Sequence, residues 1–288
     1  MIAALPDKKQ ITIQSKVVMQ FTQKEIVIKG NRVAYFDEGF RDGIPILFVH
    51  GFPFNKEMWK NQLIAFGDTH RVIAYDVRGH GRSEPGSVEF SITQFADDLL
   101  LFMEALTLGK IVVCGLSMGG YIAINAIEKE RKRITALILC DTQCNADSAE
   151  AREKRIKTIA LIRLSGLKKY ADEMVNNLFA PASVNTVPEE VTFIRESILH
   201  TNPDTVCKTL QALADRKDSC EELTKTKIPV LIMVGREDKI TPPEAAKKMH
   251  ELIPGSAFEI IDGAGHLSNL ENTKIFNARL MTFLKSLK

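Results

Sequence analysis

The sequence predicts an α/β fold in which a mostly parallel, eight-stranded sheet has helices on both faces. The main observation is that short apolar, β-branched runs alternate with longer segments whose apolar residues have helical spacing. Parallel strands need crossover connections, and the helical segments supply them. The composition agrees with this class, since 45% hydrophobic and 26% charged residues in a chain of 288 are typical of a globular protein.

Eight segments have the length and composition of strands. In chain order they are residues 25–30, 33–39, 44–51, 70–79, 110–117, 134–142, 228–238 and 256–266. The first two flank Asn31 and Arg32 and predict a hairpin. Amphipathic helices are expected between the later strands, over residues 56–67, 91–106, a segment after residue 117, and one from about residue 272. Ser91 is the expected N-cap of the second of these helices.

One interval interrupts the alternation of strands and helices. Residues 142–227 contain only helical patterns, so we expect a helical cap inserted after the sixth strand, with residues 24–141 and 228–288 forming the core domain. Open α/β sheets bind ligands at the carboxyl edge of the strands, and a cap over that edge would shape a substrate pocket. A helical decoration on one flank is the alternative. Residues 1–23 are an N-terminal arm whose role the sequence does not reveal.

Charge and cysteine content narrow the possible partners and location. The net charge is +2 and no basic stripe interleaves with aromatic residues, which argues against nucleic acid. The N-terminus lacks the pattern of a signal peptide, and no apolar run reaches membrane-spanning length, so we expect a cytoplasmic protein with no membrane partner. Five cysteines without a C-x-x-C pair predict reduced thiols rather than a disulfide framework or a zinc site.

Ser117 lies where a predicted strand becomes a predicted helix, in the pattern Gly115-Leu116-Ser117-Met118-Gly119. Glycines at such a junction permit a strained backbone and close approach of the helix to the strand. This geometry lifts the serine hydroxyl above the sheet, beside the open N-terminus of the helix. The pattern therefore predicts a nucleophile elbow, with an ordinary serine-containing turn as the alternative.

A serine nucleophile needs a base and an acid that orients the base. Of the six histidines, His266 is the candidate base because it follows the last predicted strand and so lies at the same sheet edge as Ser117. Asp238 directly follows the seventh strand and is the candidate acid. Glu237 is the runner-up, and Asp141 and Asp262 are further alternatives.

Two backbone N–H groups are the expected oxyanion donors. Met118 follows the nucleophile, and Phe52 lies in the loop after the third strand. His50, in the same loop, is expected to brace the loop rather than to act as a base. Hydrolysis through an acyl-serine intermediate needs no metal or organic cofactor, and none is expected.

Together these segments resemble the α/β-hydrolase superfamily from about Glu25 to the C-terminus. The stretches that carry the resemblance are HGFP at 50–53, DVRGHGRS at 76–83, GLSMGG at 115–120, GREDKITP at 235–242 and GAGHLSNLE at 263–271. The order serine, acid, histidine along the chain is also the order of that superfamily. Within it the chain is similar to 3-oxoadipate enol-lactonases and to cofactor-free haloperoxidase-type esterases. The resemblance implies a carboxylic ester or lactone as a small-molecule substrate.

Several alternatives remain open at the level of sequence. Cleavage of a C–C bond, perhydrolysis and acyl transfer use the same three side chains, and a ligand-binding or signalling protein can keep the same fold. The sequence does not identify the substrate-binding residues or the oligomeric state. Four arginines are candidates for binding a substrate carboxylate, with solvation at the surface as the alternative role: Arg152, Arg155, Arg163 and Arg195.

Overall fold

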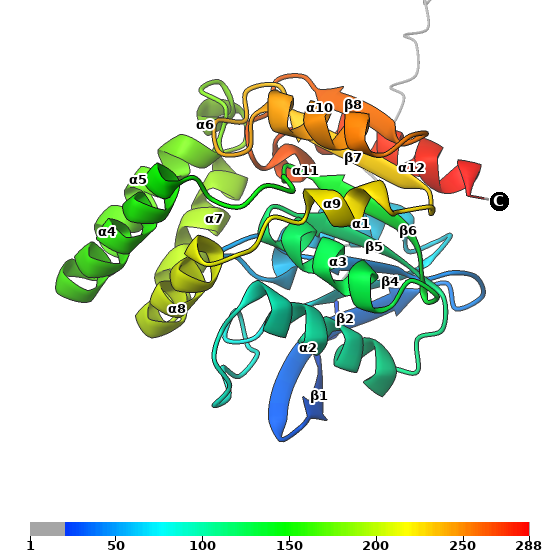
Figure 1. Cartoon of the computed structure of the whole chain (residues 1–288), viewed down its shortest axis with the longest axis horizontal. Coiled ribbons are helices and arrows are strands. Elements are labelled where there is room, and N and C mark those ends of the chain that lie inside the picture. The colour runs from blue at the N-terminus through cyan, green and yellow to red at the C-terminus, as the bar shows by residue number, and fades with distance from the viewer. Residues whose placement is uncertain (1–20, 288) are drawn as a thin grey trace, which may run out of the picture.

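An eight-stranded sheet with the order β1-β2-β4-β3-β5-β6-β7-β8 forms the centre of the computed structural model, which describes residues 21–287 (Figure 1). The strands are β1 (Lys24–Ile28), β2 (Asn31–Gly39), β3 (Ile46–Val49), β4 (Arg71–Tyr75), β5 (Ile111–Leu116), β6 (Ile134–Cys140), β7 (Val230–Gly235) and β8 (Ala257–Ile261). The β1–β2 and β2–β4 pairs are antiparallel, and every other pair is parallel. The predicted fold class is confirmed. Most of the predicted N-terminal arm lies outside the described residues.

Helices cover both faces of the sheet. They are α1 (Lys60–Phe66), α2 (Ile92–Ala105), α3 (Met118–Lys129), α10 (Pro243–Leu252) and α12 (Thr273–Ser286). In β3, Leu47 and Val49 belong to the apolar cluster that includes α2, α3 and α10, whereas Ile46 and Phe48 belong to the cluster that includes α1 and α12. Both faces of the strand are therefore buried, as a continuous apolar run predicts. No helix among the described residues is long and apolar enough to cross a membrane.

The predicted helix over residues 56–67 begins differently from the expectation. Its first turn is a 3₁₀ helix, Lys56–Trp59, and α1 follows it. At the start of this turn, the buried carboxylate of Asp76 accepts hydrogen bonds from both the backbone N–H and the side-chain Nζ of Lys56, each at 2.8 Å. Asp76 also accepts the N–H of Arg82 at 2.9 Å, so one carboxylate joins the loop after β3 to the turn after β4.

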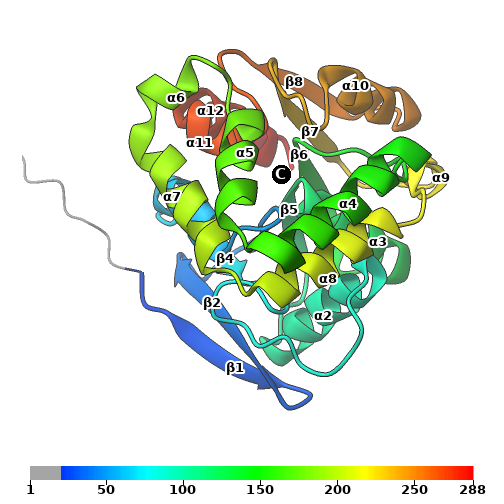
Figure 2. The same ribbon diagram turned by 90° about the vertical axis from the view of Figure 1, so that its left-hand side faces the viewer.

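The described chain between β6 and β7 forms helices joined by turns. They are α4 (Ala149–Ser165), α5 (Lys168–Leu178), α6 (Ser183–Thr186), α7 (Pro188–His200), α8 (Pro203–Ala214) and α9 (Cys220–Thr224). α4 packs against α8 and α5, and α5 packs against α7, while α9 packs on α3 and α10 of the core. Figure 2 shows α4, α5, α7 and α8 together on the side of the molecule that faces the viewer. A helical insertion therefore follows the sixth strand, as predicted.

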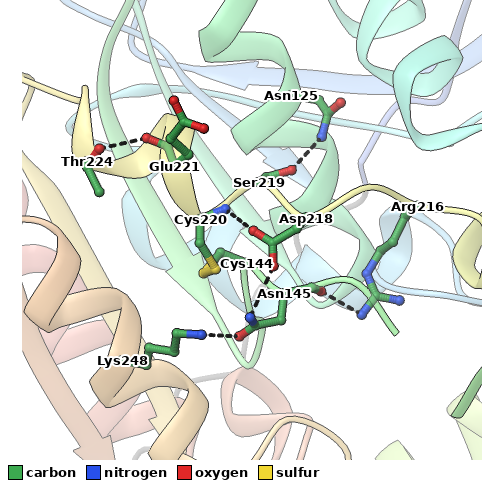
Figure 3. The surroundings of a disulfide bond; sticks show 10 residues. All are labelled: Asn125, Cys144, Asn145, Arg216, Asp218, Ser219, Cys220, Glu221, Thr224 and Lys248. Atoms are coloured by element: carbon green, nitrogen blue, oxygen red, sulfur yellow. Dashed lines mark hydrogen bonds between the residues drawn. A yellow bond between two sulfur atoms is a disulfide. The ribbon is translucent and has the colours of Figure 1, made fainter. Parts of the chain in front are cut away.

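A disulfide joins the two ends of this insertion (Figure 3). Cys144 follows β6 and Cys220 begins α9, with 76 residues of separation along the chain and a Cα–Cα distance of 4.8 Å. Beside the bond, the Asn145 side chain donates to the Asp218 carboxylate at 3.1 Å. The prediction that all cysteines are reduced thiols is thus wrong for this pair, because spacing along the chain does not show which cysteines the fold brings together. Three cysteines are free and buried: Cys114, Cys140 and Cys207.

Candidate active site

Ser117 occupies the sharp junction between β5 and α3. Its backbone has φ 53° and ψ −114°, in a region that L-residues rarely adopt, at a typical cost of about 1–3 kcal/mol. The Ser117 N–H donates to the Cys140 carbonyl at 2.9 Å, and the Ser117 carbonyl accepts the Thr142 hydroxyl at 2.8 Å. The neighbouring strand end thus holds the strained residue in place. The side chain of Ser117 makes no capping bond to α3.

The glycines around Ser117 are required by close backbone contacts. A Cβ atom on Gly119 would collide with the carbonyl oxygen of Val49 at the end of β3. A Cβ atom on Gly115 would collide with the carbonyl of Gly119 itself. Because these neighbours are backbone atoms, they cannot rotate away. The first turn of α3 therefore lies directly against two strands, which is the packing that the glycine pattern predicts.

His266 lies between Ser117 and Asp238. It belongs to the loop that joins β8 to α11 (Ser268–Glu271), and Asp238 lies just after β7. The His266 Nε2 atom is 2.8 Å from Ser117 Oγ, and its Nδ1 atom is 2.8 Å from Asp238 Oδ2. Asp238 Oδ1 accepts the N–H groups of Ile240 and Thr241 at 2.8 and 3.0 Å. The three side chains that the sequence nominates thus form a continuous hydrogen-bonded line.

His266 and Asp238 are both buried, and each shifts the pKa of the other in favour of its charged form. Burial lowers the pKa of His266, but the carboxylates of Asp238, Asp141 and Glu271 together outweigh burial, so the pKa lies above its ordinary value. Burial likewise raises the pKa of Asp238, and His266 and the bonds from Thr241 more than compensate, so that pKa is lowered. The anionic Asp238 accepts a hydrogen bond from the Nδ1–H group of neutral His266, which leaves the Nε2 lone pair facing the Ser117 hydroxyl.

Asp141 is buried near the line but makes other contacts. It follows β6 with a positive φ of 46°, and its Oδ1 and Oδ2 atoms accept the Gly235 N–H at 2.8 Å and the Ser268 hydroxyl at 2.5 Å. Burial raises the pKa of Asp141 well above its ordinary value, and the nearby Asp238 carboxylate adds to the shift. No hydrogen bond joins it to His266 in the described part of the chain.

The remaining candidate acids point away from His266. Glu237 is exposed, and Asp262 is exposed and paired with Arg236. His50 is fully buried and accepts the Val77 N–H at Nε2, at 2.9 Å, while burial lowers its pKa to about 4. His50 is thus a neutral side chain that joins the loops after β3 and β4, as the sequence predicts for a bracing residue.

Phe52 and Met118 both line the cavity above Ser117. Among residues 21–287, neither backbone N–H donates a hydrogen bond to another residue. Met118 is the first residue of α3, where backbone N–H groups have no partner within the helix. Two residues whose backbone N–H groups have no partner among the described residues therefore line the same cavity as Ser117, and their role as oxyanion donors stays a prediction.

The cavity above Ser117 and His266 has a volume of about 290 Å³ and is bounded by the helical insertion. Apolar side chains from α5 and α8 form much of its wall, among them Met174, Leu178 and Leu210. Three cations also line it, namely Lys154 and Arg155 from α4 and Lys239 beside Asp238. None of the described lining residues is acidic. The cavity is therefore apolar in its walls and positively charged.

Only one of the four arginines that the sequence nominates lines this cavity. Arg155 does so while paired with Asp147 at 2.6 Å. Arg152 is paired instead with Asp215, and Arg195 with Asp172; Arg163 does not line the cavity. The prediction missed two lysines, Lys154 and Lys239. Helical spacing could have indicated Lys154, because it lies on the same face of α4 as Arg155. The residues of α4 that line the cavity are Ala151, Lys154, Arg155 and Thr158.

A family model described as alpha/beta hydrolase fold matches residues 44–273. The chain therefore belongs to the alpha/beta hydrolase family, as its resemblance predicts. Membership of this family establishes the fold and places the protein among the hydrolases. Within the described residues, no group of three His, Cys, Asp or Glu side chains has an arrangement that could hold a metal ion.

Particular relatives and solved structures are similar to this chain over most of its length. A 3-oxoadipate enol-lactonase from Acinetobacter baylyi is 28% identical over 87% of this chain and 92% of its own length. A non-heme chloroperoxidase from Streptomyces lividans is 27% identical over 89% of this chain and 97% of its own length. A solved thermophilic esterase from Thermogutta terrifontis, described as malate bound, is 36% identical with a TM-score of 0.87 and covers 92% of this chain and 99% of its own. An enol-lactonase from Burkholderia xenovorans is 26% identical with a TM-score of 0.84, over 91% and 100% of the two chains.

Proposed function

We propose that the protein is a serine hydrolase that cleaves a carboxylic ester or lactone through an acyl-serine intermediate. The observation that carries the proposal is the continuous hydrogen-bonded line from the Ser117 hydroxyl through His266 to Asp238, on the floor of a cavity. Esterases and enol-lactonases among the relatives support the same reaction class.

In the first half of the reaction, His266 Nε2 takes the Ser117 proton as Oγ attacks the substrate carbonyl. The N–H groups of Phe52 and Met118 stabilise the oxyanion, at roughly 3 kcal/mol per donor. Asp238 stabilises the imidazolium that forms. The tetrahedral intermediate then collapses, and His266 gives its proton to the leaving alcohol oxygen, which stays attached to the acyl chain when the substrate is a lactone.

In the second half, a water molecule attacks the acyl-serine carbonyl while His266 Nε2 takes its proton. The same two N–H groups stabilise the second oxyanion. Collapse of this intermediate breaks the bond to Ser117 Oγ, which regains a proton from His266. The products are a carboxylic acid and the alcohol, or one hydroxy acid from a lactone, and the enzyme returns to its starting state.

Residues 142–227 act in this proposal as a cap that selects the substrate. The cavity that they bound is lined by Lys154, Arg155 and Lys239 and by no acidic residue, which favours a substrate with an anionic group. Two relatives point the same way, since one acts on an oxoadipate derivative and the other is described as malate bound. Comparison of a neutral ester with an anionic ester of equal length measures this preference.

Replacement of the nucleophile tests the proposed reaction. Ser117→Ala is expected to lower the kcat for p-nitrophenyl acetate by a factor of about 10⁴ or more, with circular dichroism and melting temperature unchanged. Ser165→Ala, which removes an exposed hydroxyl at the end of α4, is the matched control and keeps wild-type activity. Substantial turnover by Ser117→Ala would overturn the mechanism.

The same assay separates the enzyme from a ligand-binding protein. Wild-type protein that is acylated once per molecule and then stops would fit a receptor on this fold rather than a turnover enzyme. A panel of simple esters, lactones and an enol-lactone then distinguishes ester from lactone cleavage. The cytoplasmic location inferred from the sequence remains a prediction.

A further inference from the structure

The loop that carries His266 lies directly against the end of helix α5. The His266 N–H donates to the Leu178 carbonyl at 2.7 Å. A Cβ atom on Gly265 would collide with the Leu178 carbonyl oxygen and the Ala180 nitrogen, so only glycine permits this approach. Leu178 also lines the cavity. The segment of the helical insertion that adjoins the substrate space is thus in backbone contact with the candidate base.

Glu271 connects both sides of His266 to that segment. Its Oε1 atom accepts the N–H of Gly265 at 2.9 Å and the N–H of Leu267 at 3.1 Å. Its Oε2 atom accepts the N–H of Ala180 at 2.7 Å. A single carboxylate therefore holds the residues before and after His266 and fastens them to the chain just beyond α5.

These contacts exceed what capping of α11 requires. The bond from Leu267 alone would suffice to hold the start of the four-residue helix α11. The bond to Ala180 contributes nothing to α11, because Ala180 lies 91 residues away in the chain. All three partners are donors, and only a carboxylate offers acceptors at both oxygens. A glutamine would direct its NH₂ group at one of these N–H groups.

We propose that Glu271 is a positioning residue that holds His266 against Ser117 by tying the histidine loop to the end of α5. This inference rests on the proposed hydrolase function. Side chains of α5 that line the cavity include Tyr170, Met174 and Asn177. The helix that would contact the substrate is therefore the one to which the base is fastened.

Glu271 also affects the protonation of His266. The carboxyl groups that face His266 are Asp238 after β7, Asp141 after β6 and Glu271 on α11. Burial lowers the pKa of His266, and each of these groups raises it. Removal of the Glu271 charge therefore lowers the pKa of His266 and extends its basic form to lower pH. Because this effect depends on charge and distance alone, the pKa of His266 reports the Glu271 charge, whereas kcat reports the placement of His266.

The test compares Glu271→Gln with wild type in p-nitrophenyl acetate hydrolysis. We expect kcat to fall about 10- to 100-fold, as for a misplaced catalytic group, and the acidic limb of kcat/KM to move to lower pH. Asp262→Asn is the matched carboxylate-to-amide control in the loop that carries His266, because Asp262 is exposed and paired with Arg236. The control should keep the wild-type kcat and pH profile.

Glu271→Asp separates the effect of the negative charge from the effect of side-chain length. It keeps the negative charge but is one methylene too short to hold both segments, so kcat should fall while the acidic limb stays near its wild-type position. A wild-type kcat and pH profile in Glu271→Gln would overturn the inference. The Ser117→Ala assay is independent of Glu271. Retained activity in Ser117→Ala would reject the hydrolase mechanism, whereas wild-type kinetics in the Glu271 variants alone would reject only the positioning role.

Hydrogen exchange of the wild-type protein tests the same three bonds to Glu271 without a variant, and so applies even when a variant fails to fold. The amides of Ala180, Gly265 and Leu267 share one acceptor side chain. If they open as one unit, they exchange with equal opening free energies. Fast exchange at Ala180 beside strong protection at Gly265 and Leu267 would show that the insertion moves independently of the histidine loop, and would overturn the proposal.

Discussion

Two buried carboxyl groups, Asp238 and Asp141, lie at the ends of neighbouring strands and differ in their partners. Asp238 accepts two backbone N–H groups, the Thr241 hydroxyl and His266. Asp141 accepts one backbone N–H and one hydroxyl. The lowered pKa of Asp238 and the raised pKa of Asp141 follow from this difference together with burial. Two carboxyl groups whose pKa values are pushed apart have different roles. Asp238, with the lowered pKa, is the anionic partner of His266.

Asp238→Asn tests this assignment through the pH profile. We expect kcat to fall by about 10⁴, as when an asparagine selects the wrong histidine tautomer. Wild-type activity is lost as the pH falls through the raised pKa of His266, because only the neutral imidazole is a base. Loss of the Asp238 charge lowers that pKa relative to wild type, so the acidic limb of the remaining activity moves to lower pH. Glu237→Gln is the control, and a larger loss in Asp141→Asn would contradict the assignment.

At the scale of elements, helix α4 and the loop after β7 each contribute a lysine to the cavity lining. Lys154 extends from α4 and Lys239 from the loop, and neither forms an ion pair with another described residue. Arg155, the third cation, is engaged by Asp147. The two lysines are therefore the charges available to an anionic substrate.

Charge reversal at Lys154 or Lys239 measures their contribution. For a p-nitrophenyl hemiester of a dicarboxylic acid, kcat/KM should fall about three- to fivefold in Lys154→Glu and in Lys239→Glu, a size typical of exposed ion pairs. For the neutral ester of equal length it should change less than about twofold. Added salt should reduce the difference. Lys157→Glu, on α4 outside the cavity lining, is the control; equal losses in all three variants would reject a specific site.

At the scale of the whole molecule, the Cys144–Cys220 disulfide closes a loop of the chain that contains α4 to α8. It joins the two ends of the helical insertion to each other, and α9, which Cys220 begins, packs on α3 and α10 of the core. Disulfides are uncommon in reducing compartments, so this bond weighs against the cytoplasmic location that the sequence predicts. Thiol titration of the isolated protein decides whether the bond forms.

Cys220→Ser should lower the free energy of unfolding by about 4 kcal/mol, because the bond closes a loop of 76 residues and so restricts the unfolded chain. Urea denaturation measures the change, and a reductant should destabilise wild type but leave the variant unaffected. Unreduced, denatured wild type should contain three titratable thiols, and reduction should raise the number to five. Five thiols before reduction would contradict the disulfide.

The sequence by itself determined the fold class, the site of the helical insertion and the nomination of Ser117, Asp238 and His266. Strand and helix periodicity depends on neighbouring residues, and parallel strands place their carboxyl ends at one edge of the sheet. Gly115 and Gly119 added a local signal, because the close approach of α3 tolerates no side chain there.

Only the tertiary structure decided which of the four candidate acids is hydrogen-bonded to His266, which cysteines form a bond, and which cations of the insertion line the cavity. It also revealed the contacts of Glu271. These features depend on distances between segments far apart in the chain, such as the 149 residues between Ser117 and His266. Local periodicity indicates which face of an element is buried, whereas the partner of a side chain is set by the packing of the whole molecule.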